Sequence, residues 1–261
     1  MPFHQPEAIR YFTFENLDEH RVIHAAFTRK GGLSPPPWAS LNVGGLRGDD
    51  PDRVYGNRVL AFQTIGRMPE SVFDVWQVHG NNVICTNEPR PKDASHKKAD
   101  AIFTDRPEVT LFMRFADCVP VLLYDPICKV VGLVHAGWQG TVYGTVSEAL
   151  DVMAAQYSSK TGNIQAAIGP SICPKHYPVG DEVVKEVWSN FGDAASRLLS
   201  TVNNRIHLDL WEANRLRLEW KGVRDAYVSK LCTACNLNNW YSHRGESGQT
   251  GRFGVLIALP T

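Results

Sequence analysis

Three short apolar segments follow one another in the middle of the chain, at residues 109–115, 120–125 and 129–135, with polar or proline-containing breaks between them. Apolar runs of this length are typical of buried β-strands. Residues 141–157 follow with apolar side chains at helical spacing, which predicts an amphipathic helix. Hydrophobic residues make up 43% of the 261 residues, enough to form a core and too many for a disordered chain.

Other segments predict strands and helices in mixed order, without a strict βαβ alternation. Aromatic and β-branched residues indicate strands, and Asp-Pro or Asp-x-x-Glu sequences indicate helix starts. Strands are expected at residues 72–78, 164–168 and 253–259, and helices after Asp50-Pro51, at 183–191 and after Asp209. We therefore predict an α/β or α+β sandwich that forms a single domain over residues 1–261.

Charge and composition exclude several classes of protein. Lys and Arg number 27, as do Asp and Glu, so bulk charge does not indicate a nucleic-acid-binding protein. The apolar runs are too short to span a bilayer, and six cysteines are too few for a disulfide framework. The N-terminal segment lacks the apolar stretch of a signal peptide. We expect a cytoplasmic protein that binds neither nucleic acid nor membranes.

Three potential metal ligands follow predicted strands and stand beside small residues: His79, Cys118 and His135. They are far apart in sequence, whereas structural zinc fingers use close pairs of ligands. Three dispersed ligands suit an open site, in which a fourth position is left for water or substrate. Two alternatives remain at this point. The side chains are simply packed or capped, or Cys118 is the nucleophile of a Cys-His hydrolase with His135 as its base.

Many ordered segments resemble one known family. They are residues 28–32, 40–42, 48–50 and 57–58, then QVHG at 77–80, ADCVPVLLYDP at 116–126, HAGWQG at 135–140 and IGPSIC at 168–173, and finally 232–233, 242–244 and 250–252. The resemblance is to the YfiH/YlmD family, once named a multicopper polyphenol oxidase or laccase domain family and later described as purine nucleoside phosphorylases. So many segments in one order make a chance match improbable.

The resemblance implies a fold, a cofactor and an activity. The fold is a sandwich of packed β-sheets with helices outside. His79, Cys118 and His135 become the ligands of a catalytic Zn²⁺. The implied reaction is phosphorolysis of adenosine, inosine or guanosine to the base and ribose 1-phosphate, accompanied by adenosine deamination and methylthioadenosine phosphorolysis. The partners are therefore a small nucleoside and phosphate, and either a monomer or a dimer is compatible with the sequence.

Copper oxidation is a second candidate chemistry, and nucleoside sensing without turnover is a third. Multicopper clusters are built largely from His-x-His pairs, and this chain has nine His and no such pair. A blue-copper site adds a weak axial Met, and of four Met only Met113 is close in sequence to Cys118. Zinc therefore ranks above copper. The His-x-Glu and Pro-Cys-x-x-Cys signature of zinc base deaminases is also missing.

Phosphorolysis requires groups that hold a phosphate dianion, for which the arginine fork is well suited. The candidates for substrate binding are Arg29, Arg47, Arg58 and Arg244, with Asn42 as a polar orienting group and His243 near the C-terminus. Arg47 is equally well explained as a solvated surface charge. Asp117, beside Cys118, is expected to orient a ligand or to act as acid or base, unless it is a turn residue.

A Cys-x-x-Cys pair, Cys232 and Cys235, departs from the family pattern, which includes only the Cys-Thr sequence. No second Cys-x-x-Cys exists in the chain to complete a four-cysteine zinc site. We interpret the pair as two neighbouring thiols without a redox role.

Overall fold

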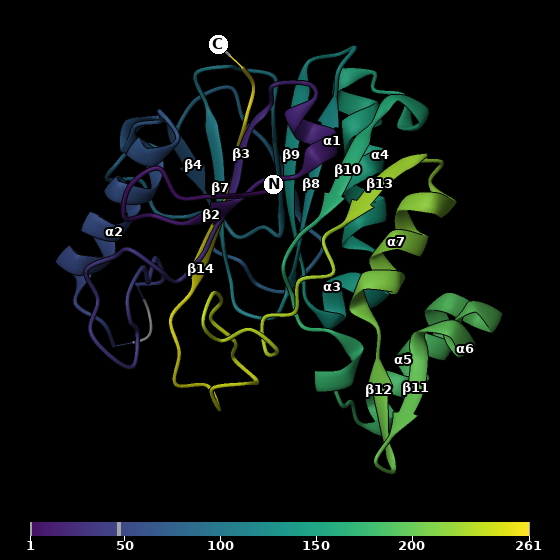
Figure 1. Ribbon diagram of the computed structural model, residues 1–261. Coiled ribbons are helices and arrows are strands. Elements are labelled where there is room, and N and C mark those ends of the chain that lie inside the picture. Colours follow the sequence, from purple (N-terminus) through teal and green to yellow (C-terminus); the bar gives the residue numbers. More distant parts are fainter. Residues whose placement is uncertain (1, 46–47, 261) are drawn as a thin grey trace.

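The computed structural model describes residues 2–45 and 48–260 (Figure 1). Two six-stranded mixed sheets form its centre. In spatial order, the first sheet contains β1 (Phe3–His4), β2 (Tyr11–Phe12), β3 (Ile23–Phe27), β14 (Phe253–Ala258), β7 (Thr110–Phe115) and β4 (Val72–Asp74). The second contains β13 (Asp225–Val228), β10 (Gln165–Ile168), β8 (Val119–Asp125), β9 (Val130–Ala136), β6 (Ala101–Thr104) and β5 (Val83–Cys85).

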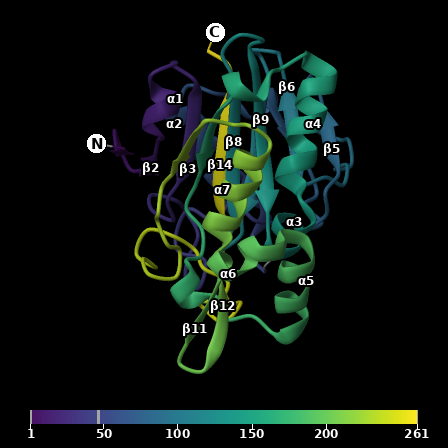
Figure 2. The same cartoon turned by 90° about the vertical axis from the view of Figure 1, so that its right-hand side faces the viewer.

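Helices cover the outer faces of both sheets. α2 (Pro51–Thr64) lies beside the first sheet, and α4 (Thr145–Tyr157) and α7 (Leu210–Trp220) lie beside the second (Figures 1 and 2). The remaining elements are α1 (Glu15–Asp18), α3 (Trp138–Tyr143), α5 (Asp181–Phe191), α6 (Ala195–Leu198), the hairpin of β11 (Leu199–Val202) and β12 (Arg205–Leu208), and the 3₁₀ turns η1 (Pro69–Ser71), η2 (Thr161–Asn163), η3 (Pro174–His176) and η4 (Gly192–Ala194). The predicted sandwich of mixed sheets flanked by helices is confirmed.

Alternating side chains explain why β8 and β9 are apolar throughout. Every residue of both strands is buried. In β9, Val131 and Leu133 belong to the core between the two sheets, whereas Val130 and Val134 belong to the core under the helices. A strand buried on both faces needs apolar residues at successive positions rather than at alternate ones. The apolar runs noted in the sequence are therefore the central strands of the fold.

Some predicted elements have different bounds in the structure. The helix expected over 141–157 begins earlier and is divided in two at Gly144, whose φ of 85° is the left-handed conformation that ends a helix and favours glycine. The strand expected over 72–78 ends at Asp74, after which Trp76 forms only an isolated bridge with Lys98. The helix starts at Asp50 and Asp209 are confirmed, because each carboxylate caps two amides of the following turn. Among the described residues, no helix has both the length and the hydrophobicity needed to cross a membrane.

Candidate active site

Three potential metal ligands converge where the chain passes from one sheet to the other. Cys118 lies in the turn between β7 and β8, and His135 lies in β9, paired with Pro120 of β8. His79 lies in the loop that follows β4. The ligand atoms of the three side chains all lie within 4.8 Å of one another. The structure thus brings together the residues that the sequence suggests as ligands.

Asp100, directly before β6, connects two of these ligands. Its Oδ1 accepts a hydrogen bond from Nδ1 of His135 at 2.8 Å. The same carboxylate accepts the amide hydrogens of Val78, His79 and Gly80 at 3.2, 3.0 and 2.7 Å. With Nδ1 of His135 donating to a carboxylate, Nε2 is left as the ligand atom, an arrangement common in metal sites. Asp100 is fully buried, and these hydrogen bonds fix the positions of both histidines.

The backbone at two positions is strained and held in place by hydrogen bonds. His79 and Asp117 have φ angles of 60° and 81°, which are uncommon for residues other than glycine. The amide of His79 is held by Asp100. The carboxylate of Asp117 accepts hydrogen bonds from Thr233 Oγ1, Ser242 Oγ and the amide of Arg244, at 2.7, 2.6 and 2.6 Å. The C-terminal segment is therefore fastened to the turn that carries Cys118.

Cys118 and His135 form a charged pair. Burial alone would raise the pKa of the Cys118 thiol, but His135 and His79 outweigh it and lower the pKa to about 6. Burial likewise opposes protonation of His135, but the Cys118 thiolate and Asp100 raise its pKa above the usual value. A thiolate is the form in which cysteine binds a metal or acts as a nucleophile. The electrostatics therefore suit either a metal site or a Cys-His pair.

Gly137 leaves the space that a metal would need beside the ligands. A Cβ atom at this position would lie 2.8 Å from Nδ1 of His79 and 3.2 Å from Sγ of Cys118. Any other residue would therefore fill the space next to the ligand atoms. Two imidazoles and one thiolate form a donor set of borderline softness, which zinc and copper both accept. The residues present thus fit a metal ion with an open position.

A cavity of about 460 Å³ opens from the three ligands. Its walls combine cationic, polar and aromatic side chains. They include Arg58, Arg114 and Arg252, together with Trp76, Gln77, His96 and His243. A volume of this order matches that of small-molecule sites, which are typically about 300–1,000 Å³. The cavity therefore brings a potential metal site and several positive charges to one space of small-molecule size.

The positive charge of one wall is arranged around Asp74. Its carboxylate lies 2.7 Å from Nε of Arg90 and 3.3 Å from Nη1 of Arg114, and Nε2 of His96 lies 3.0 Å away. Burial opposes ionisation of Asp74, but His96, Arg114 and Arg90 hold the pKa of its carboxyl well below the usual range. Burial and the nearby Arg114 lower the pKa of Arg58 to about 10. Arg90 and Arg114 share one carboxylate, and Arg58 and Arg114 line the cavity, so the charge at this wall is net positive and suits an anion.

Known proteins resemble the chain over most of its length. Residues 23–260 match the family described as "Multi-copper polyphenol oxidoreductase laccase". The chain belongs to this family. It is 37% identical over 239 residues to a purine nucleoside phosphorylase of Deinococcus radiodurans, covering 92% of this chain and 90% of that protein. It is 35% identical over 252 residues to the purine nucleoside phosphorylase YlmD of Bacillus subtilis, covering 94% and 91%.

A solved structure has the same fold. The crystal structure of the hypothetical protein YfiH from Bacillus licheniformis superimposes with a TM-score of 0.91, at 31% sequence identity, and the match covers 99% of each chain. The resemblance to the YfiH/YlmD family found in the sequence is therefore confirmed, as is the fold expected from it.

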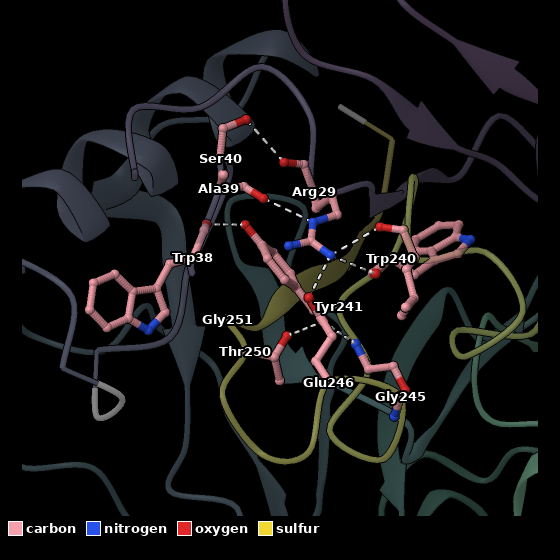
Figure 3. A network of polar contacts seen from close by, with 12 residues as sticks. Arg29, Trp38, Ala39, Ser40, Trp240, Tyr241, Gly245, Glu246, Thr250 and Gly251 are labelled. Carbon is pink, nitrogen blue, oxygen red and sulfur yellow. Dashed lines mark hydrogen bonds and ion pairs between the residues drawn. The ribbon is translucent and has the colours of Figure 1, made fainter. Parts of the chain in front are cut away.

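Two of the predicted substrate-binding residues, Arg58 and His243, line the cavity. Arg29 is not among the lining residues. Its guanidinium donates to the Ala39 carbonyl at 2.9 Å, pairs with Glu246 at 2.9 Å, and stacks on the ring of Tyr241 (Figure 3). Glu246 also accepts hydrogen bonds from the Ser242 amide and the Thr250 hydroxyl. Arg29 thus holds the N-terminal loop against the C-terminal segment.

Asn42 and Arg244 also lie outside the cavity wall. Asn42 is fully buried, and its Oδ1 accepts the amide hydrogens of Gly44 and Arg252 at 3.0 and 2.9 Å. It therefore positions the backbone of two cavity residues. Arg244 donates to the Pro178 carbonyl at 3.2 Å and lies over the ring of Tyr177. Arg47 lies outside the described residues.

The sequence does not single out three important residues of the site: Asp100, Arg114 and Arg252. Each of these residues has a sequence feature that could have identified it. Asp100 stands directly before four apolar or small buried residues, and Arg114 is the one charged residue in β7. Arg252 ends the family segment 250–252. A charge within a buried strand is costly unless it is paired or functional, and this rule would have selected the first two.

Proposed function

We propose that the chain is a zinc-dependent purine nucleoside phosphorylase, which cleaves adenosine, inosine or guanosine with phosphate to the free base and ribose 1-phosphate. The proposal depends on one observation above all: His79, Cys118 and His135 line the same cavity as Arg58, Arg114 and Arg252. The names of the relatives support this assignment. Adenosine deamination and methylthioadenosine phosphorolysis are further reactions that we assign to the same cavity.

The reaction requires a phosphate oxygen to form a bond to C1′ of the ribose while the bond from C1′ to the purine nitrogen breaks. The electron pair of the broken bond leaves with the purine, which then takes up a proton. Arg58, Arg114 and Arg252 line the cavity and are assigned to hold the phosphate dianion, because fixed positive charge lowers the cost of aligning it with C1′. His243, on the same cavity wall, is assigned to supply the proton to the purine.

The metal is assigned to the three converging side chains, and Asp100 is assigned to keep His135 in the ligating tautomer. When bound, zinc would supply a Lewis acid at one end of the cavity. Arg29, Asn42, Arg244 and Asp117 receive supporting roles in this proposal, since their contacts connect the loops that carry the cavity residues. Arg47 keeps its predicted role in substrate binding.

Copper-dependent oxidation of phenols is the second candidate, because two histidines and one cysteine also form the core of blue-copper sites. Two observations favour zinc. Within residues 2–45 and 48–260, the groups able to hold a metal include only three of the nine histidines, His79, His135 and His176, too few for a multicopper cluster. Met113 is buried in the core between the sheets and is not among the cavity-lining residues.

One experiment separates the candidates. Metal-analysed protein is incubated with adenosine or inosine, with and without phosphate, and the products are identified. Phosphorolysis yields adenine or hypoxanthine together with ribose 1-phosphate, only when phosphate is present. Inosine formed from adenosine in either condition would report deamination. Bound copper with oxygen consumption on a phenol, and no nucleoside cleavage, would contradict the proposal.

A further inference from the structure

A second group of potential metal ligands lies outside the cavity and has no role in the proposed reaction. It consists of Cys173, His176, Cys232 and Cys235, whose ligand atoms all lie within 4.8 Å of one another. The two neighbouring thiols predicted from the sequence are therefore joined by a third thiol and a histidine. These two residues come from a Cys-x-x-His sequence at 173–176 rather than from a second Cys-x-x-Cys.

The topology of the second sheet explains why these segments meet. β10 and β13 are neighbouring parallel strands, so the loops that follow them leave the sheet at the same end. Ser171 and Cys232 extend this pairing as an isolated parallel bridge. Cys173 and His176 follow β10, and Cys232 and Cys235 follow β13. Two short ligand pairs from adjacent loops are the usual construction of a structural zinc site.

The distances match tetrahedral coordination. Nδ1 of His176 lies 3.5, 3.8 and 3.4 Å from the sulfurs of Cys173, Cys232 and Cys235, and the sulfurs of Cys173 and Cys235 are 4.0 Å apart. Zinc–sulfur and zinc–nitrogen bonds of about 2.3 and 2.0 Å, arranged tetrahedrally, place the ligand atoms about 3.5 to 3.8 Å from one another. The side chains are thus already spaced for one ion.

Two backbone amides donate hydrogen bonds to the sulfur of Cys232. The amides of Cys173 and Cys235 both donate to Sγ of Cys232, at 3.3 and 3.4 Å, and a hydrogen bond to a charged form stabilises it. Three cysteine sulfurs and one imidazole nitrogen gathered this closely form a donor set that zinc accepts.

We propose that Cys173, His176, Cys232 and Cys235 form a second, structural zinc site of the Cys₃His type. All four coordination positions come from the protein, so this site has no place for substrate, unlike the site at Cys118. A zinc ion bound at this second site would stabilise the active site through contacts made outside the cavity. Thr233, inside the Cys-x-x-Cys pair, donates to Asp117, and the amide of Ile172 donates to the Asp117 carbonyl at 3.0 Å. Asp117 directly precedes Cys118.

The test is a zinc count on tag-free protein that was produced with added zinc. We expect two zinc ions per chain in the wild type, one in Cys235→Ser and one in Cys118→Ser, because each variant loses a ligand of one group. Cys85→Ser is the matched control, since Cys85 is an exposed cysteine outside both groups and should leave two ions bound. At most one ion in the wild type, with an unchanged count in Cys235→Ser, would overturn the proposal.

A second measurement does not depend on the folding of Cys235→Ser. In Cys118→Ser the first group has no sulfur ligand, so cobalt bound to this variant should show intense tetrahedral and sulfur-to-metal absorption only from the second group. Absence of that absorption would contradict the proposal. The proposal would also be contradicted if the intact mass of the non-reduced wild type were lower by two hydrogens. That mass difference would report a disulfide in place of the metal. Neither measurement depends on the nucleoside activity.

Discussion

The Oδ1 atom of Asp100 lies 2.8 Å from Nδ1 of His135, while the same carboxylate accepts the amide of His79 at 3.0 Å. One buried side chain therefore orients two ligands that stand 56 positions apart in the chain, at 79 and 135. The geometry of the proposed metal site is thus set by a residue that does not ligate the metal.

Replacing Asp100 with Asn should weaken zinc binding without removing a ligand. Asparagine has one acceptor oxygen in place of two, so it cannot accept from both His135 and all three loop amides, and loss of such partners typically costs about 10- to 100-fold in metal affinity. The measurement is zinc affinity by competition with a chelator. Asp151→Asn is the control, because Asp151 pairs only with Lys221 on the surface. Equal affinities in both variants would contradict this role of Asp100.

Gly137→Ala should lower zinc occupancy of the site by steric conflict. The added Cβ would lie 2.8 Å from Nδ1 of His79, whereas the backbone φ of −69° suits any residue. Zinc content after dialysis against a weak chelator is the readout. A Cβ at Gly180 has no atom within 4 Å, so Gly180→Ala should behave as wild type. Full zinc retention by Gly137→Ala would show that the space beside the ligands is not needed.

Arg58→Lys should raise the KM for phosphate more than the KM for nucleoside. A single ammonium cannot reproduce the two parallel hydrogen bonds of a guanidinium, and a charged hydrogen bond contributes about 1.5–3 kcal/mol, which corresponds to tenfold or more. Steady-state kinetics with each substrate varied separately is the measurement, and the partly exposed Arg53 supplies the control Arg53→Lys. Equal increases in both KM values would indicate a general structural defect.

The features that the sequence predicts depend on residues close together in the chain. The contacts that it does not predict join residues far apart in the chain. The apolar runs at β7, β8 and β9 identify the central strands because burial on both faces determines composition locally. His79, Cys118 and His135 could be selected because each follows or ends a strand predicted from the sequence. The pairing of Arg29 with Glu246 joins positions 217 apart, and nothing local in the sequence indicates it. The same holds for Cys173 and Cys235, which only the pairing of β10 with β13 brings together.

Asp74→Asn should change the dependence of stability on pH. The folded-state pKa of Asp74 is depressed, so its ionised carboxylate stabilises the fold above the unfolded pKa of about 3.9, and this contribution is lost as pH falls through the lower folded value. At neutral pH the variant should be about 3 kcal/mol less stable, as expected when one partner of a buried ion pair is removed. The difference should shrink below about pH 4.

Urea denaturation of both proteins at several pH values measures this dependence. Asp151→Asn again serves as the control, since an exposed ion pair contributes about 0–1 kcal/mol. A constant difference between wild type and Asp74→Asn across the acid range would show that the effect arises from packing rather than from the charge.

The most direct test of the account is the yield of ribose 1-phosphate from inosine and phosphate as zinc is titrated into metal-free protein, compared between wild type and His79→Ala. The account predicts that product formation rises with bound zinc in the wild type and is lost in His79→Ala, because this residue is required for the metal but not for a Cys118–His135 nucleophile. Undiminished phosphorolysis by metal-free protein or by His79→Ala, or release of free ribose in place of ribose 1-phosphate, would contradict it.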